Sequence, residues 1–287
     1  MHVLIIGSGP AGISAAIYAR RAGAEVTVAA HGTGALARAE LVENYYGFAA
    51  PIPGTELVQK GIAGAKRLGV VCEEDEIVGI QLMDTGAGFL AEGIRRAYEA
   101  DAVIIAAGAQ RRSISVPGIA AYEGRGVSYC AICDAFFYRG KNVAVIGAGE
   151  YALHEAQILL PHAAQVTMLT NGAALSAKPT DPISVVSKKI ARIEGDCRVR
   201  QIIFADDTQM DADGIFVAIG TAGSLELARK LGVLLRDGAI DVGEHMETNV
   251  PGIYAAGDCT GGLLQIAKAV YEGAEAGLSA VRYLRKT

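Results

Sequence analysis

The chain has 287 residues and a net charge of −5, with 51% hydrophobic and 20% charged residues. This length exceeds what one hydrophobic core usually serves, so we expect two domains. The acidic balance argues against nucleic-acid binding, and no apolar run reaches the length of a membrane span. No signal peptide is evident, and the odd cysteine count is unlike a secreted disulfide framework. We therefore expect a cytoplasmic α/β protein.

A short apolar strand, a glycine turn at residues 7–12 and a predicted helix open the chain. The turn reads Gly-Ser-Gly-Pro-Ala-Gly, which is the GxGxxG pattern of dinucleotide binding in the strand–turn–helix context that it requires. Gly7 permits the tight turn, Gly9 lets a pyrophosphate approach the backbone, and Gly12 lets the helix pack on the strand. The N–H groups at the helix start then face the phosphates.

An aromatic loop at residues 41–48 carries one polar amide, Asn44. The loop is either a hydrophobic plug or a wall along a flat cofactor ring, with Asn44 hydrogen-bonded to a ring carbonyl. A helix over residues 55–68 and three short strands are predicted next. The apolar run that ends at Gly108 is typical of a buried parallel strand.

Two cysteines separated by two residues, Cys130 and Cys133, begin the second predicted unit. Such a pair closes a disulfide ring or binds a metal, and zinc would favour a second cysteine pair, which this chain lacks. We therefore favour a redox disulfide and assign no metal. One thiolate would attack a partner's disulfide and the other would resolve the mixed disulfide. Asp134 is placed to shuttle protons, while two inert buried cysteines remain an alternative.

A second glycine turn, Gly147-Ala148-Gly149, follows the strand predicted at residues 142–146. The strand at residues 165–169 then leads into a loop, residues 170–175, that holds neither a cation for an NADP phosphate nor an acid for an NAD ribose. Bulky side chains also occupy the first turn of the helix. We expect this glycine turn to be an empty relic.

The C-terminal part predicts a buried strand at residues 253–256 and a helix from about residue 262 to 284. Gly257 and Asp258 lie between them, where Asp258 suits a ribityl hydroxyl or a phosphate contact. Capping of the helix by Asp258 is the plainer alternative. Residues 265–267, Gln265, Ile266 and Ala267, stand at the predicted helix start, where N–H groups face the crevice.

Taken in order, these motifs resemble the low-molecular-weight thioredoxin reductases along essentially the whole chain. The matching segments are Gly7-Ser8-Gly9-Pro10-Ala11-Gly12, Val42-Glu43-Asn44, Cys130 to Phe137, Gly147 to Gly149, and Gly252 to Asp258. The resemblance implies two Rossmann-like three-layer α/β domains. An FAD domain, residues 1–112 and 241–287, is split by a smaller inserted domain, residues 113–240, that carries the CxxC pair.

The resemblance also implies roles for single residues. Cys133 would lie against the flavin and receive its electrons, Cys130 would attack the thioredoxin disulfide, and Asp134 would be the nearby acid. A homodimer is implied as well. The expected FAD contacts are Gly7, Ser8, Gly9, Pro10, Ala11, Gly12, Gly34, Leu36, Asn44, Gly108, Gly257, Asp258, Gln265, Ile266 and Ala267.

Departures from the family pattern concern the electron donor. The basic segment usual after the second glycine turn is replaced by Leu169 to Leu175, and the usual GGQL is Thr33-Gly34-Ala35-Leu36. The chain therefore looks most like the ferredoxin-dependent flavin thioredoxin reductases. A basic rim would help an acidic ferredoxin dock, and the candidates are Arg111, Arg112, Arg139, Lys141 and Lys268. The alternatives are an NAD(P)H-dependent reductase, a reductase with another low-potential donor, and an FAD redox sensor without turnover.

Overall fold

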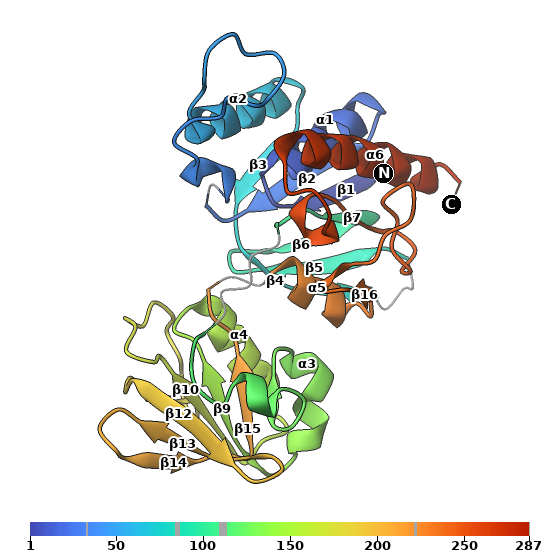
Figure 1. Ribbon diagram of the computed structural model, residues 1–287. Coiled ribbons are helices and arrows are strands. Elements are labelled where there is room, and N and C mark those ends of the chain that lie inside the picture. The colour runs from blue at the N-terminus through green and yellow to red at the C-terminus, as the bar shows by residue number, and fades with distance from the viewer. Residues whose placement is uncertain (33, 84–86, 109–113, 221–222, 287) are drawn as a thin grey trace. The chain divides into compact units, whose positions relative to one another are not determined.

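The computed structural model describes residues 1–286 except 33, 84–86, 109–113 and 221–222. The chain divides into two compact units, and the second interrupts the first in sequence (Figure 1). The first unit comprises Met1–Gln110 and Gly223–Thr287, and the second comprises Arg111–Ala222. The boundary expected near Arg112 lies outside the described residues.

A five-stranded parallel sheet forms the centre of the first unit, in the order β18-β7-β1-β2-β3. Four of its strands, β18, β7, β1 and β2, are mostly apolar and buried, as in sheets covered on both faces, whereas the edge strand β3 has no buried residue. The bounds are β1 (His2–Ile6), β2 (Glu25–Ala30), β3 (Val71–Glu74), β7 (Ala102–Ile105) and β18 (Ile253–Ala255). The order places β7 and β18, which are far apart in sequence, side by side.

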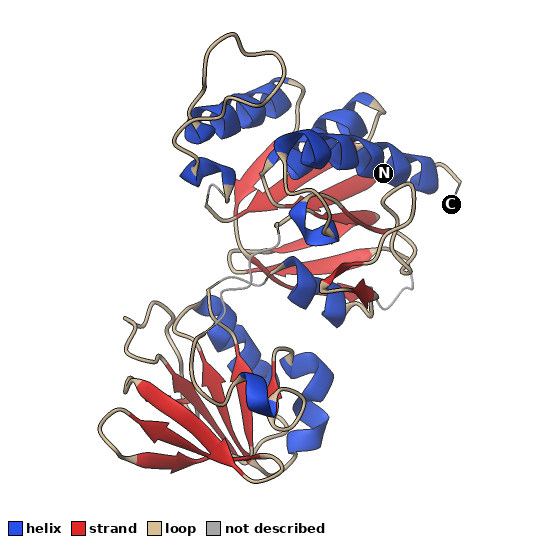
Figure 2. Cartoon of the chain, in the orientation of Figure 1, coloured by secondary structure: helices blue, strands red, loops and turns tan. Residues whose placement is uncertain are grey.

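Two helices pack closely against each other over one face of this sheet, α1 (Pro10–Arg21) and α6 (Ile266–Leu284) (Figure 2). They approach closely because α6 presents Gly273 and Gly277, where any Cβ would clash with backbone carbonyls of α1. Ser14 Oγ adds a 2.6 Å hydrogen bond to the carbonyl of Val270. The N-terminal regions of the two helices are thereby held together. A third helix, α2 (Gly54–Arg67), packs against α1.

The first unit also holds an antiparallel sheet and a short helix. The elements are β4 (Ile77–Leu82), β5 (Phe89–Gly93), β6 (Ala97–Ala100), α5 (Ser224–Lys230), β16 (Leu235–Arg236) and β17 (Ala239–Ile240). Helix α5 packs against β4, and Lys230 Nζ donates a 2.8 Å hydrogen bond to the carbonyl of Val78. Residues 223–240 therefore lie in the first unit here, whereas the sequence analysis assigned them to the inserted domain.

The second unit is built on another five-stranded parallel sheet, in the order β11-β10-β9-β15-β8, beside an antiparallel sheet, β12-β13-β14. The parallel strands are β8 (Val127–Ser128), β9 (Asn142–Ile146), β10 (Gln165–Leu169), β11 (Ser184–Val186) and β15 (Gly214–Val217). The remaining elements are α3 (Ala131–Asp134), α4 (Glu150–Leu159), β12 (Ile190–Gly195), β13 (Val199–Phe204) and β14 (Gln209–Asp211). An apolar core joins the two sheets.

The structure confirms the predicted fold class, two α/β units with parallel sheets of which the first is split by the second. Two local expectations were wrong. Among the described residues between α2 and Ala100 there are four strands, not three. The last helix begins at Ile266 rather than near 262, because Gly261 and Gly262 take positive φ angles of +75° and +70°. In the described part of the chain, no helix is both long and apolar enough to cross a bilayer.

Candidate active site

The first glycine turn forms an open backbone cradle at the start of α1. Gly9 is the N-cap of this helix, and no side chain hydrogen-bonds to the cap. A Cβ at Gly9 would meet no atom within 4 Å, whereas a Cβ at Gly12 would clash with the carbonyl of Gly7. The turn is therefore closed on its inner side and open where a phosphate would approach. Ser8, Pro10 and the buried Ala11 complete it.

A cavity of about 240 Å³ opens beside this turn within the first unit. Five of the residues expected to contact a cofactor are among those that line it: Ser8, Gly9, Pro10, Leu36 and Ile266. Tyr45, from the aromatic loop, lines the cavity too, which fits the reading of this loop as a wall. The rest of the lining comes mostly from apolar residues of α1 and α2.

The two predicted amide residues meet although they are 221 residues apart in sequence. Asn44 Nδ2 donates a 3.0 Å hydrogen bond to Gln265 Oε1. Gln265 is the N-cap of α6, and Ala267 follows in the first turn. The aromatic loop is thus hydrogen-bonded to the start of α6, where the cofactor contacts Gln265, Ile266 and Ala267 are expected. Gly34 and Gly108 lie in turns with φ angles of +70° and +78°.

A buried ion pair on α6 holds the loop that carries Gly257 and Asp258. Glu272 Oε2 accepts hydrogen bonds from Gly257 N at 2.8 Å and from Lys268 Nζ at 3.0 Å. Lys268 Nζ also donates to the carbonyl of Gly257 at 3.0 Å, and Thr260 Oγ1 joins the cluster. Sequence reasoning missed this pair, whose signal was the i, i+4 spacing of Lys and Glu.

Capping of α6 by Asp258 was the plainer reading of that residue, and it is wrong. Asp258 begins a separate 3₁₀ turn (Asp258–Thr260), and the cap of α6 is Gln265. The Asp258 carboxylate is therefore available for another role.

In the second unit, Cys130 and Cys133 are joined by a disulfide at the start of the short helix α3. Their Cα atoms are 5.4 Å apart, and Cys130 Sγ also accepts a 3.3 Å hydrogen bond from Cys133 N. Cys130 is only 4% exposed, whereas Cys133 is exposed. The sulfur expected to attack a partner is thus the less accessible of the two in this structure.

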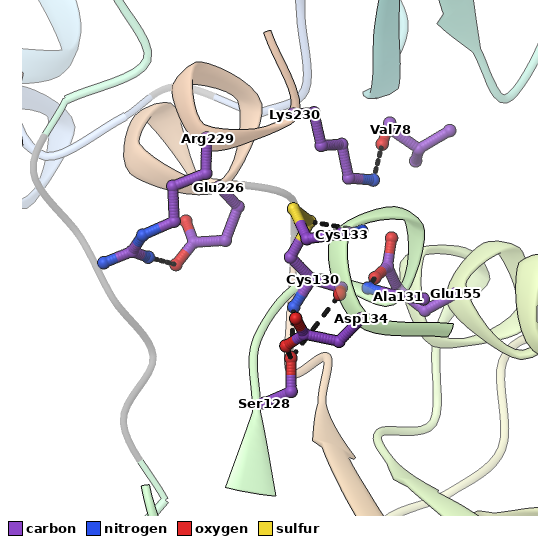
Figure 3. The surroundings of a disulfide bond; sticks show 10 residues. All are labelled: Val78, Ser128, Cys130, Ala131, Cys133, Asp134, Glu155, Glu226, Arg229 and Lys230. Carbon is purple, nitrogen blue, oxygen red and sulfur yellow. Dashed lines mark hydrogen bonds and ion pairs between the residues drawn. A yellow bond between two sulfur atoms is a disulfide. The ribbon is translucent and has the colours of Figure 1, made fainter. Parts of the chain in front are cut away.

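Two carboxylates hold the helix that carries this disulfide (Figure 3). Ser128 Oγ donates a 2.6 Å hydrogen bond to Asp134 Oδ2 and accepts one of 3.1 Å from Cys130 N. On α4, Glu155 is 1% exposed, and its Oε2 accepts a 2.7 Å hydrogen bond from Ala131 N. Asp134 was predicted from the sequence, and Ser128 and Glu155 were not.

The second glycine turn is closed by the chain's own backbone. The carbonyl of Ala148 accepts hydrogen bonds from Ser176 N at 2.8 Å, Ser176 Oγ at 3.2 Å and Ala177 N at 3.3 Å. A Cβ at Gly149 would already lie 3.6 Å from Ser176 Oγ, in contrast to the open space at Gly9. The loop after β10 therefore folds back over the turn.

A model of the pyridine nucleotide-disulphide oxidoreductase family matches residues 1–273. The chain belongs to this family. It is 34% identical to the thioredoxin reductase of Bacillus subtilis (strain 168) over 302 residues, which cover 99% of this chain and 95% of that protein. These matches make it a thioredoxin reductase-like flavoprotein disulfide oxidoreductase.

Two crystal structures of this family resemble the chain over nearly its full length. An atypical thioredoxin reductase from Desulfovibrio vulgaris Hildenborough is 40% identical, with a TM-score of 0.95 and coverage of 99% of this chain and 98% of that one. A ferredoxin-flavin thioredoxin reductase from Clostridium acetobutylicum is 33% identical, with a TM-score of 0.74 and coverage of 100% and 98%. The solved relatives thus include a reductase named for ferredoxin.

The cofactor of this family member is FAD, and the first unit fits it. The open space at Gly9 and the uncapped start of α1 suit a pyrophosphate. The cavity beside them is lined mostly by apolar side chains, as ligand sites usually are. The space at the second glycine turn is narrower, because a Cβ at Gly149 would lie 3.6 Å from Ser176 Oγ.

The three described cations of the expected docking rim all contact neighbouring groups of the chain. Lys268 belongs to the buried pair with Glu272, so it is not a free rim cation. Lys141 Nζ donates to the carbonyl of Phe137 at 3.0 Å, and the Arg139 guanidinium lies 5.7 Å from the Phe136 ring centre. Arg139 and Lys141 still lie at the surface. Arg111 and Arg112 lie outside the described residues.

The remaining cysteines differ sharply in their surroundings. Cys259 is 1% exposed, and burial raises the pKa of its thiol to about 12. Burial also raises the pKa of the Cys72 thiol, with a smaller opposing effect from Lys66. Cys197 is exposed. None of the three is disulfide-bonded.

Proposed function

We propose that this protein reduces thioredoxin through FAD and the Cys130–Cys133 disulfide, with electrons from reduced ferredoxin rather than from NAD(P)H. When bound, FAD exchanges electrons one or two at a time, so it can join a one-electron donor to a two-electron disulfide. The family membership supports the disulfide chemistry. The donor is inferred from the second glycine turn.

The closure of the second glycine turn is the observation that carries the choice of donor. A dinucleotide needs the space in front of the middle glycine and free N–H groups at the helix start. Ser176 and Ala177 take the place in front of Ala148 instead. The first helical residue, Glu150, adds a negative charge where a pyrophosphate would lie. Residues 170–175 also offer no cation to a 2′-phosphate.

The chemistry of the cysteines follows from thiol–disulfide exchange. In the reduced pair, the Cys130 thiolate attacks one sulfur of the thioredoxin disulfide and forms a mixed disulfide. The Cys133 thiolate then attacks Cys130 Sγ, re-forms the Cys130–Cys133 bond and releases reduced thioredoxin. Two electrons pass to the thioredoxin sulfurs, and Asp134 supplies a proton to the leaving thiolate. Attack by Cys130 requires a rearrangement that exposes it, because it is only 4% exposed here.

A second candidate donor is NAD(P)H. The strand–turn–helix of β9 and α4 keeps Gly147 and Gly149, and no side chain hydrogen-bonds to the cap at Gly149. An outward movement of residues 170–178 would reopen the turn. In that case NADPH or NADH would reduce the protein directly.

Anaerobic absorbance of the purified yellow protein separates these donors. NADPH, NADH and reduced ferredoxin are added in separate runs, and oxidised thioredoxin follows. We expect rapid loss of the flavin band with ferredoxin alone and its return with thioredoxin. Rapid stoichiometric bleaching by NADPH would show that the second glycine turn is a working site. Bleaching without reoxidation by thioredoxin would instead favour a redox sensor.

The proposal includes a homodimer and a cytoplasmic location. The first rests on the resemblance to thioredoxin reductases, and the second on the cysteine usage of the sequence. Light scattering of the holoprotein tests the assembly, and we expect twice the 29.7 kDa mass of one chain.

A further inference from the structure

One buried acid beside the disulfide has no part in the exchange chemistry described above. Glu155 lies on α4, and its side chain points to the start of α3 (Figure 3). It is 1% exposed, which is rare for a glutamate and costly unless the carboxylate is hydrogen-bonded. Its Oε2 accepts the N–H of Ala131, the residue directly after Cys130, at 2.7 Å. This length is typical of a charged acceptor.

We propose that Glu155 is a positioning residue that also sets the redox balance of the Cys130–Cys133 pair. Its hydrogen bond fixes the backbone between the two cysteines, and its negative charge opposes thiolate formation at Cys130. The inference rests on the proposed role of this pair in reducing thioredoxin. It deepens that role by naming a residue that keeps the dithiol strongly reducing.

The distance between the charge and the sulfur supports this role. Cys130 Sγ is separated from Ala131 N by four covalent bonds, so the sulfur lies at most about 8 Å from the Glu155 carboxylate oxygen. Cys130 is 4% exposed and Glu155 is 1% exposed, so water screens the charge poorly. A unit charge at this range alters a thiol–thiolate equilibrium by roughly tenfold.

The direction of the effect follows from the charges of the two redox states. Reduction of the disulfide takes up two electrons and yields thiols that are partly ionised. A nearby negative charge destabilises the thiolate and hence the reduced form. The pair then gives up its electrons more readily, as a donor to thioredoxin must. The second acid, Asp134, is bound by Ser128 and handles the proton in the exchange, so the two carboxylates have separate roles.

The test compares four holoprotein variants by their redox equilibrium. E155Q keeps an acceptor for Ala131 N but removes the charge, E155D keeps the charge, and E155A removes both. E123Q removes one charge at an exposed site of the same unit and is the matched control. Each protein is equilibrated in dithiothreitol buffers of graded potential, and the fraction of reduced Cys130–Cys133 is measured by alkylation and peptide mass spectrometry.

In buffers above the ordinary thiol pKa of about 8.5, where the thiolate is the main reduced species, we expect E155Q to shift this equilibrium roughly tenfold toward the reduced form, which corresponds to about 30 mV. Reduced E155Q should also alkylate faster at Cys130 at neutral pH, while E155D and E123Q stay close to the wild type. An unchanged equilibrium in E155Q would overturn the proposal. A shift in E155A without one in E155Q would overturn it too, because the effect would then come from the hydrogen bond and not from the charge.

The redox titration uses neither ferredoxin nor thioredoxin. A negative result for Glu155 can therefore be told apart from a negative result for the proposed function. A cysteine pair that equilibrates normally but never reduces thioredoxin would contradict the function and leave the Glu155 result standing. The flavin spectrum and the thermal midpoint of each variant show that it is folded.

Discussion

Ser128 Oγ donates a 2.6 Å hydrogen bond to Asp134 Oδ2 and at the same time accepts the N–H of Cys130. One hydroxyl thus joins the proposed acid to the first residue of the disulfide. Ser128 is 7% exposed and ends β8, so the parallel sheet of the second unit sets its position. The acid is therefore oriented by the fold and not only by its place next to Cys133.

Replacement of Asp134 should slow thioredoxin reduction more than replacement of Ser128, which donates a hydrogen bond to it. Loss of a general acid usually costs 10²–10⁴ in rate, so we expect Asp134→Asn to lower kcat by roughly a hundredfold or more. Ser128→Ala keeps the acid but frees its orientation, and we expect a loss of roughly tenfold. Turnover with thioredoxin measures both. Ser184→Ala, at an exposed serine of β11, is the control, and equal rates for all four proteins would remove Asp134 from the mechanism.

The same substitution should weaken FAD binding at the first glycine turn and have no effect at the second. Gly9 and Gly149 have φ angles of −72° and −109°, which alanine also adopts. A methyl group at Gly9 would enter the open cradle, so Gly9→Ala should weaken FAD binding by at least tenfold, measured by fluorescence titration of the apoprotein. Gly149→Ala should change neither FAD affinity nor the rate with ferredoxin. Bleaching of the wild type by NADPH that is lost in Gly149→Ala would reveal a nucleotide at the second turn.

The buried pair of Lys268 and Glu272 should contribute far more stability than a surface pair of the same spacing. Their side chains are only 17% and 10% exposed, and removal of one partner from such a pair costs about 3 kcal/mol. We expect Lys268→Ala to lower the free energy of unfolding by this amount and to loosen FAD, because the Gly257 loop loses two hydrogen bonds from Lys268 Nζ.

Urea unfolding followed by circular dichroism gives the comparison. Lys60 and Glu56 form an exposed i, i+4 pair, with side chains 57% and 48% exposed. Lys60→Ala should therefore cost about 0.5 kcal/mol or less. Similar losses of unfolding free energy in the two variants would mean that the hydrogen bonds of Lys268 do not stabilise the Gly257 loop.

Trapping with serine variants decides which sulfur attacks the partner. If Cys130 attacks, Cys133→Ser should accumulate a mixed disulfide with thioredoxin, and Cys130→Ser should not. Mass spectrometry of the covalent complex identifies the linked cysteine. Cys133 is the more accessible sulfur for a partner in this structure. A complex formed by Cys130→Ser alone would therefore make Cys133 the attacking residue and Cys130 the resolving one.

The buried thiol of Cys259 should resist alkylation and reduce stability at high pH. Burial raises its pKa from the ordinary 9.0 to about 12, so iodoacetamide at pH 8 should label Cys197 and leave Cys259 unmodified until the protein unfolds. The folded state keeps this proton to a higher pH than the unfolded chain. The stabilisation is therefore complete below pH 9 and is lost as the pH rises toward 12. Labelling of Cys259 at the rate of Cys197 would contradict this.

Local residue patterns were enough to predict several features of the fold and the site. The strand–glycine–helix of β1 and α1, the CxxC pair with Asp134, and the buried parallel strands all follow from residue spacing and apolar periodicity. The order of these motifs was sufficient to indicate the family, which the comparisons then showed. The absence of a cation in residues 170–175 was also visible in the sequence alone.

Only the tertiary structure brought together residues that are distant in the chain. The contacts of Asn44 with Gln265 and of Glu155 with Ala131 depend on how separate elements pack, and no local periodicity encodes them. The same holds for Ser176 on the carbonyl of Ala148, which needs the path of a whole loop after β10. Sequence spacing shows which residue types are present, but hydrogen bonds between elements depend on close packing of the folded chain, and these bonds decide which motifs remain open to a ligand.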